Sequence, residues 1–332
     1  MAYVSIMNRI IWIDIAKAIC IVLVVIGHYI PDIHPIWYGA MNKIIYTFHM
    51  PLFMFASGFV YMATKNNVGY GKFLWRKVKR LMIPYLTVSL VVVTIKLCTQ
   101  EGTYVENPVT AMSYLKIFYL PEAGYFLWFI WALWWMFVLV PLFVTPYFRL
   151  GLFIVSLFLP MVSSFLPEEF CIKEFSRMLQ YFMAGVVVYE WKEYLKCCKR
   201  IPVIVVLFVF CIVEAMPYLG GGGNSVLTAA IGISLVLRIS YAVANHVKTS
   251  TWGNCVMTIS SASYIIYLFH TTFEGGMKAL VLKLPYISNL SNEMFFTIGA
   301  IMVVSSGIIF PVLLYKYILG RYNVLRILFG LK

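Results

Sequence analysis

Long apolar runs are the feature that most constrains how this chain can fold. A run of about 20 apolar residues is long enough to cross the hydrocarbon core of a bilayer as a helix. Ten candidate spans follow one another along the chain: 10–30, 44–63, 80–98, 125–146, 150–166, 175–191, 201–219, 226–245, 257–275 and 294–319. Because lipid offers the backbone no hydrogen-bond partner, each span has to pair its own N–H and C=O groups, as a helix does. The sequence therefore predicts an all-α fold, a polytopic bundle of about ten transmembrane helices.

The composition indicates a membrane protein as well. The 332 residues are 62% hydrophobic and 12% charged, and the mean hydropathy is +0.87. A soluble domain cannot bury that much apolar surface in one core, so we expect a single integral-membrane domain over residues 1–332. The net charge of +13 does not predict a nucleic-acid partner, because most basic residues lie in short segments between spans, where Lys and Arg keep loops in the cytoplasm.

The basic residues also predict the orientation in the bilayer. They gather after the second, sixth and tenth spans: Lys65, Lys72, Arg76, Lys77, Lys79 and Arg80; Lys192, Lys196, Lys199 and Arg200; Lys316, Arg321, Arg326 and Lys332. The opposite side carries acidic residues: Glu101, Glu106, Glu122, Glu168 and Glu169. With ten spans the three basic segments share one side, and both termini are predicted to be cytoplasmic.

The first span contains three ionisable side chains, Asp14, Lys17 and His28. Each costs about 2.5–3.5 kcal/mol at the centre of a bilayer on insertion scales, so packing alone does not explain them. Asp14 precedes Lys17 by three residues, a spacing that lets the two pair on one helix face. His28 lies about 16 Å from Lys17 along the helix axis. Histidine exchanges protons near neutral pH, so His28 is a candidate general base. A hydrated, inert histidine at the interface is the alternative.

Two further histidines reach the same predicted depth, near the outer boundary. His49 lies early in the second span, and His270 lies late in the ninth. This layer of His28, His49 and His270 predicts a polar site, although three unrelated interfacial residues would give the same pattern. The histidines and cysteines match no metal-binding spacing, so we expect no metal.

The segment from Lys72 to Arg80 leads directly into the third span and is predicted to be a cytoplasmic loop. One interpretation is topology plus attraction to anionic lipid, worth about 1 kcal/mol per basic residue. The other is a phosphate-binding site for a nucleotide-like ligand, made by Arg76, Lys77, Lys79 and Arg80. At the outer start of the sixth span, Glu174 and Arg177 have the spacing of an interfacial ion pair.

Five motifs occur in order along nearly the whole chain: Lys17 with His28 after ten residues, Phe48–Phe59, the basic segment ending in Arg80–Tyr85, Leu127–Leu133, and Ile259–His270. Together they resemble the membrane-bound acyltransferase-3 family, which includes bacterial sugar and polysaccharide O-acetyltransferases. The run Phe48–Phe59 is the most specific. Many relatives have Arg at the position of Lys17. Relatives also often carry two arginines spaced by two residues in the basic segment, where this chain offers Arg76 with Lys79, or Lys77 with Arg80.

The resemblance implies transfer of an acyl group, usually acetyl, from acyl-CoA to a hydroxyl of a sugar or related cell-envelope acceptor. In that frame His28 is the general base, Lys17 with Asp14 organises the donor or the polar helix face, and the basic segment binds the CoA phosphates from the cytoplasm. We expect the acceptor-binding residues to be His49, Ser57, Trp128, Glu174, Arg177 and His270. The implied partners are acyl-CoA, a saccharide or glycolipid and the lipid bilayer, in a bacterial cytoplasmic membrane.

A transporter or flippase for a saccharide or lipid-linked saccharide is the alternative from another class, since buried polar residues also line substrate paths. No repeat relates the two halves of the sequence, and the basic segment fits a donor-binding role better. The acceptor, the length of the acyl chain, the side of the membrane on which the acceptor is modified and the oligomeric state are left open.

Overall fold

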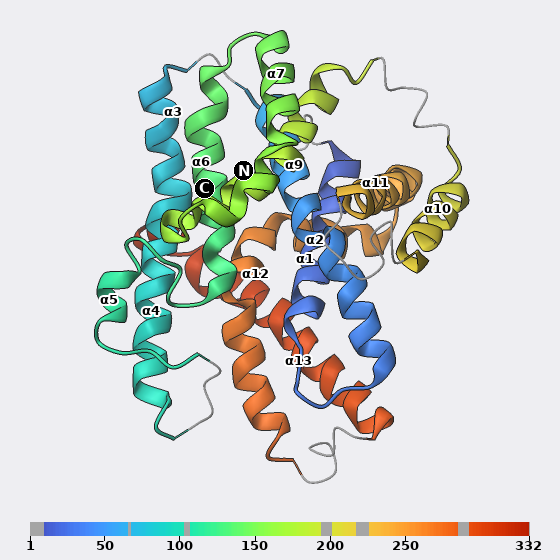
Figure 1. Cartoon of the computed structure of the whole chain (residues 1–332). Coiled ribbons are helices and arrows are strands. Elements are labelled where there is room, and N and C mark those ends of the chain that lie inside the picture. Colours follow the sequence, from blue (N-terminus) through green and yellow to red (C-terminus); the bar gives the residue numbers. More distant parts are fainter. Residues whose placement is uncertain are drawn as a thin grey trace. The chain divides into compact units, whose positions relative to one another are not determined.

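The computed structural model describes residues 10–65, 68–102, 107–193, 201–216, 226–284 and 292–331, apart from the side chains of residues 248 and 249. Every regular element among these residues is a helix (Figure 1), so the predicted all-α class is confirmed for the described part of the chain. Several basic residues on which the predicted orientation rests, such as Lys196, Lys199 and Arg200, lie outside the described residues.

Within the described residues, six helices are long and apolar enough to cross a membrane: Ile11–His28, Ile36–Ala63, Tyr70–Thr99, Tyr125–Leu142, Val226–Val247 and Glu293–Leu319. A bent pair, Pro146–Ser156 with Leu159–Phe165, makes a seventh if the two act as one span. The described residues of the expected spans at 175–191, 201–219 and 257–275 contain helices that do not meet the same criteria of length and apolar composition. A helical membrane protein is supported, while ten spans and cytoplasmic termini stay predictions.

The segment from Lys72 to Arg80 was predicted to be a loop, and this is wrong. It is helical: α3 (Tyr70–Lys77) continues through the π-helical turn η1 (Val78–Met82) into α4 (Ile83–Thr99). No glycine or proline interrupts it before Pro84, so nothing ends the helix where the basic residues begin. Pro84 lacks an N–H and would press against the carbonyl of Arg80 in a regular helix, and the wider π turn lies at the place where that strain would arise.

The chain forms two compact units, and the boundary falls inside two helices. Unit 1 comprises Met1–Ala56 and Trp191–Val312, and unit 2 comprises Ser57–Glu190 and Leu313–Lys332. Helices α2 (Ile36–Ala63) and α13 (Glu293–Leu314) therefore contribute residues to both.

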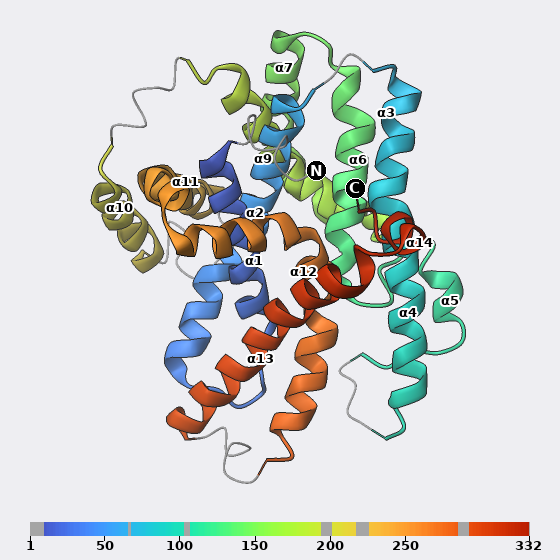
Figure 2. The ribbon, with the colours of Figure 1, turned by 180° about the vertical axis from the view of Figure 1, so that it is seen from behind.

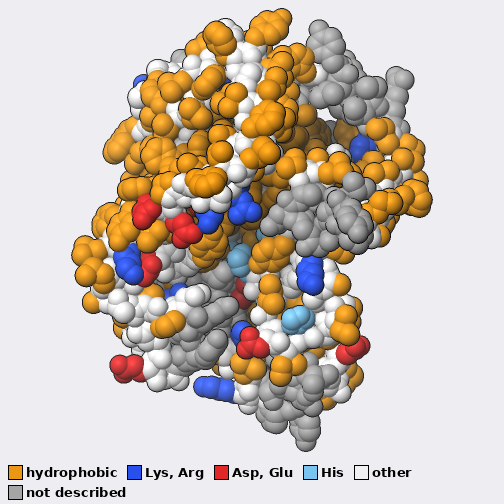
Figure 3. All heavy atoms as spheres, in the orientation of Figure 1, with side chains coloured by type: hydrophobic (Ala, Val, Ile, Leu, Met, Phe, Trp, Pro, Cys, Tyr) orange, Lys and Arg blue, Asp and Glu red, His pale blue; other side chains and the backbone are white. Residues whose placement is uncertain are grey.

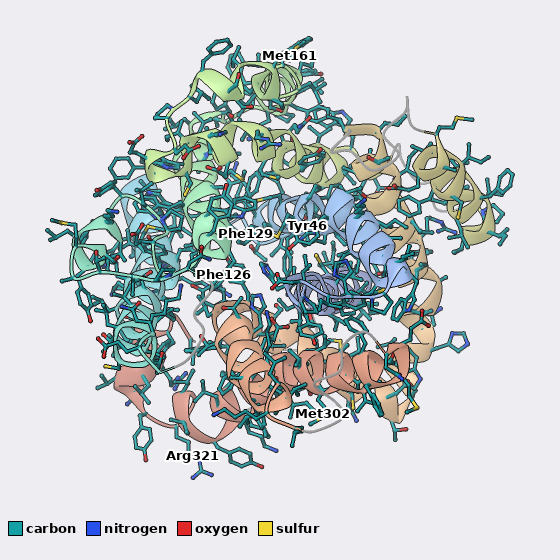
Figure 4. All side chains as sticks on the ribbon, turned by 60° about the horizontal axis from the view of Figure 1, so that its bottom comes forward. Tyr46, Phe126, Phe129, Met161, Met302 and Arg321 are labelled. Carbon is teal, nitrogen blue, oxygen red and sulfur yellow. The ribbon has the colours of Figure 1, made fainter. Side chains whose placement is uncertain are left out.

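In unit 1, α1 (Ile11–His28) packs along α12 (Thr251–Val281) and also contacts α11 (Val226–Thr249), as Figures 1 and 2 show. Helix α10 (Val203–Ala215) packs against α11. On the other side of α1, Tyr29, Tyr38 and Phe296 belong to one buried apolar cluster, against which Met302 of α13 packs (Figure 4). This packing places both ends of α1 against other helices of the unit.

In unit 2, α9 (Ile172–Glu190) packs against α6 (Trp128–Leu139) and α7 (Pro146–Ser156). Arg149 of α7 and Glu190 of α9 form a buried ion pair. The remaining helices are α5 (Ser113–Lys116), α8 (Leu159–Val162), α14 (Asn323–Leu328) and the short turns η2 (Tyr125–Leu127), η3 (Val140–Leu142), η4 (Ser163–Phe165), η5 (Glu169–Cys171) and η7 (Tyr315–Leu319). The visible surface over α6 and α7 is mostly hydrophobic, whereas charged side chains gather near α5 (Figure 3).

Gly58 of α2 packs directly against the backbone of α9 within unit 2. A Cβ atom there would overlap the carbonyl oxygen of Phe182, which is backbone and cannot rotate away. We therefore expect Gly58→Ala to destabilise the protein by about 1–3 kcal/mol, the usual range for overpacking. The thermal unfolding midpoint in detergent measures it. Gly151→Ala on α7 is the matched control, since nothing lies within 4 Å of its Cβ position; equal midpoints for the two variants would contradict this account.

Candidate active site

A polar network lies on one face of α1 in unit 1. Lys17 Nζ donates to Asp14 Oδ1 at 3.2 Å, and the ion pair expected from their spacing is confirmed. Ser260 Oγ of α12 donates to the same carboxylate oxygen at 3.1 Å. Small hydroxyl side chains within membrane helices usually serve close helix packing. The structure adds a hydrogen bond that ties α12 to the charged face of α1.

Two of the predicted histidines have one ring nitrogen fixed by their own helix. His49 Nδ1 lies 2.8 Å from the Ile45 carbonyl oxygen, and His270 Nδ1 lies 2.8 Å from that of Tyr267. A carbonyl only accepts, so in the neutral ring Nδ1 carries the proton and Nε2 carries the lone pair. His49 is 2% exposed and His270 is 0% exposed. Both rings therefore present a hydrogen-bond acceptor inside the protein.

The structure brings the three histidines of the predicted layer together. The ring centroids of His28 and His270 are 4.9 Å apart in an edge-on arrangement, and His49 lies within electrostatic range of His28. The Cys20 thiol donates to the His49 carbonyl oxygen at 3.0 Å, which holds α2 against α1 at this level. Tyr46, labelled in Figure 4, packs edge-on against His49 with 4.8 Å between centroids. The cluster is thus formed by α1, α2 and α12.

The four predicted phosphate-binding residues lie in unit 2, on α3 and η1. Arg76, Lys79 and Arg80 are exposed, and no described acidic side chain forms an ion pair with them. Lys77 points elsewhere: its ammonium lies 3.5 Å from the centre of the Phe137 ring, a cation–π contact with α6. Residues three and four apart share a helix face. Arg76, Lys79 and Arg80 therefore share one exposed helix face. The contact with Phe137 directs Lys77 away from that face.

Glu174 lines a pocket of about 390 Å³ in unit 2, with Asn107, Pro108, Leu120, Pro121, Glu122, Gly124, Tyr125, Glu168 and Cys171. The expected ion pair with Arg177 is wrong: Tyr125 Oη donates to Glu174 Oε1 at 2.7 Å, and Arg177 is exposed. Glu174 is 9% exposed, so its carboxylate needs a hydrogen-bond donor inside the protein. The Tyr125 hydroxyl provides that donor, whereas Arg177 is exposed.

Cys171 is the thiol in this pocket, and it is not suited to attack an acyl group. Burial, followed by the neighbouring Glu174 carboxylate, raises the pKa of the Cys171 thiol to about 12. The thiol therefore stays protonated near neutral pH, and only the thiolate is an effective nucleophile.

The remaining predicted residues, Ser57 and Trp128, are half-buried in unit 2. Trp128 packs against Phe129 with 6.2 Å between ring centroids. The histidine cluster within unit 1 does not include Ser57, Trp128 or Arg177, which belong to unit 2. Among the residues that the structure describes, no group of three or more His, Cys, Asp or Glu side chains is placed to hold a metal ion.

Comparison with known proteins decides the family. A family model described as an acyltransferase domain matches residues 10–316, which is most of the chain. The chain belongs to the acyltransferase-3 family. The match contains every motif from Lys17 to His270 on which the resemblance was based.

Two nodulation proteins named NolL are similar to this acyltransferase-3 chain. The protein from Mesorhizobium japonicum is 29% identical over 154 residues, 45% of this chain and 39% of the relative. The protein from Sinorhizobium fredii is 33% identical over 141 residues, 41% of this chain and 37% of the relative. The matched part thus spans about two fifths of each relative's length. No solved structure matches the chain significantly.

Two buried polar residues of the acyltransferase-3 chain were missed by the sequence reasoning. Glu274 of α12 is 5% exposed and Asn42 of α2 is 4% exposed. Glu274 follows His270 by four residues, and Asn42 precedes His49 by seven. Both spacings place them on the helix faces that carry the histidines. A search for polar residues at helical spacing from each histidine would have found Glu274 and Asn42.

Proposed function

We propose that this chain is an integral-membrane O-acyltransferase. It moves an acyl group, expected to be acetyl, from acyl-CoA to a hydroxyl of a saccharide or related cell-envelope acceptor in a bacterial cytoplasmic membrane. Membership of the acyltransferase-3 family supports the reaction class. The contact between the His28 and His270 rings, in a cluster fixed by helix carbonyls, is the observation that carries the assignment of the base.

In the proposed reaction the imidazole of His28 removes the proton of the acceptor hydroxyl. The oxygen attacks the thioester carbonyl carbon and forms a tetrahedral intermediate. When this collapses, the carbon–sulfur bond breaks, the new ester forms, and the leaving CoA sulfur takes the proton from His28. A positioned base of this kind contributes about 10²–10⁴-fold to the rate. His270 is proposed to position His28, because its buried ring packs edge-on against the His28 ring with 4.9 Å between centroids.

The exposed basic face of Arg76, Lys79 and Arg80 is proposed to bind the phosphates of the donor. Arginine binds phosphate through two parallel N–H donors, and lysine binds it as a point charge. A helix presents such groups in a fixed arrangement, unlike the loop expected from the sequence. Asp14 and Lys17 are proposed to hold the polar face of α1 in a fixed position against α12. Their ion pair and the hydrogen bond from Ser260 to Asp14 provide this.

Acetyl-CoA titration of the purified protein in nanodiscs tests this function. We expect saturable binding, and transfer of the labelled acetyl group to a saccharide acceptor fraction. Absence of binding to any acyl-CoA would contradict the proposal and would favour the alternative function, a saccharide transporter. Saccharide flux into liposomes would then be the next measurement.

A further inference from the structure

Unit 1 contains three buried polar side chains that the proposed chemistry does not use. Tyr38 and Asn42 lie on α2 and Glu274 lies on α12, with exposed fractions of 3%, 4% and 5%. Neither the Nδ2 nor the Oδ1 atom of Asn42, nor Oε1 of Glu274, makes a hydrogen bond within the described residues. Buried polar groups in native proteins almost always have a partner, so three unpaired atoms in one region require an explanation.

These side chains meet around the outer end of α1. The Tyr38 hydroxyl donates to the Ile26 carbonyl oxygen at 3.2 Å, two residues before His28. The same phenol interacts electrostatically with Glu274 and lies within hydrogen-bonding reach of the Asn42 side chain. The unpaired atoms therefore gather next to the residue assigned as the base.

Two glycines lie close to these polar side chains. A Cβ atom at Gly307 of α13 would lie 2.8 Å from Glu274 Cγ and 3.0 Å from its Oε1. One at Gly27 of α1 would lie 3.9 Å from Asn42 Oδ1. The missing side chain at Gly307 makes room for Glu274 beside α13, and Gly27 lies in ordinary contact distance of Asn42.

We propose that Tyr38, Asn42 and Glu274 form a subsite that binds two neighbouring hydroxyl groups of a neutral acceptor, a vicinal diol, beside His28. The inference rests on the proposed acyl transfer and names the acceptor's chemical class. The subsite offers acceptors at Glu274 Oε1, Asn42 Oδ1 and the Tyr38 oxygen, and a donor at Asn42 Nδ2. A hydroxyl group both donates and accepts, so two adjacent hydroxyls match this mixed set. The carboxyl group disfavours a phosphate or another anion here.

Binding of small matched probes to the nanodisc-embedded protein, without acyl-CoA, tests the subsite. The probes are 1,4-anhydroerythritol, a rigid cis diol, 3-hydroxytetrahydrofuran, its mono-alcohol, and 3-aminotetrahydrofuran, a cation of similar shape. Saturation-transfer NMR measures each. We expect the diol to bind about 3- to 10-fold more tightly than the mono-alcohol, the worth of one added neutral hydrogen bond. Because donor and turnover are absent, failure here is distinct from failure of the acyltransferase proposal.

Variants locate the effect. Glu274→Gln keeps an acceptor oxygen and should retain the diol preference, whereas Glu274→Leu and Asn42→Leu should remove it. Glu293→Gln, an exposed carboxyl at the start of α13, is the control and should change nothing. Equal binding of diol and mono-alcohol to the unaltered protein would overturn the proposal, whatever the variants do to folding. Tighter binding of the amine, lost in Glu274→Gln, would also overturn it, in favour of a cationic ligand.

Discussion

Replacing His28 with alanine is expected to slow acyl transfer by about 10²–10⁴-fold, the range that a positioned general base supplies. The acceptor hydroxyl would then have to lose its proton to solvent inside a site lined by apolar helices. Binding of acetyl-CoA should be unchanged, because the donor phosphates are assigned to α3 and η1 and not to α1. Single-turnover transfer of labelled acetyl from acetyl-CoA measures the step without interference from product release.

The matched control is His246→Ala, which removes an exposed histidine of α11 in the same unit. It should leave transfer and stability unaltered. A His28→Ala protein that transfers acetyl at the normal rate would remove His28 from the mechanism. A variant that loses acetyl-CoA binding together with transfer would instead indicate a structural role for His28.

Neutralising the basic face with Arg76→Gln, Lys79→Gln and Arg80→Gln is expected to weaken acetyl-CoA binding by about 100-fold or more. Hydrogen bonds to charged groups contribute about 1.5–3 kcal/mol each, and exposure to water reduces that value at this surface. The change should be smaller for dephospho-CoA, which carries one phosphate group fewer for the basic face to bind. Nanodiscs of neutral phosphatidylcholine exclude competition from anionic lipid.

Lys77→Met provides the sharpest control for this face. The ammonium of Lys77 lies over Phe137 and not on the exposed side, so its loss should alter stability more than donor binding. Unchanged binding in the triple variant would mean that the basic residues serve topology and lipid attraction alone. Cysteine-accessibility labelling of the triple variant checks that the orientation in the membrane is retained.

The grouping of the three histidines could be predicted from the sequence, but the helices that are neighbours around them could not. Position along an apolar run fixes how far a residue lies across the bilayer, which is why His28, His49 and His270 fell in one predicted layer. Which helices are neighbours depends on the shapes of apolar faces that look alike in sequence. The contacts of α1 with α12, and the bond from Ser260 to Asp14, were therefore out of reach.

The basic segment illustrates another limit. Charge patterns indicate the side of the membrane but do not distinguish a loop from a helix that extends beyond the bilayer. Only the absence of breakers between Lys72 and Pro84 favoured the helix that the structure contains. That helix points Lys77 about 100° away from Arg76, one position before it, and the Lys77 ammonium lies over Phe137.

The hydrogen bond between Ser260 and Asp14 has a consequence for biogenesis. The two residues are 246 positions apart, so at 5–20 residues per second the ribosome makes Ser260 on the order of 12–50 s after Asp14. During that interval α1 must enter the translocon and the lipid without its later partner. Lys17, three residues away, is available to Asp14 at once. A local counter-charge of this kind allows the first helix to insert early and to keep a carboxylate that only the finished protein can use.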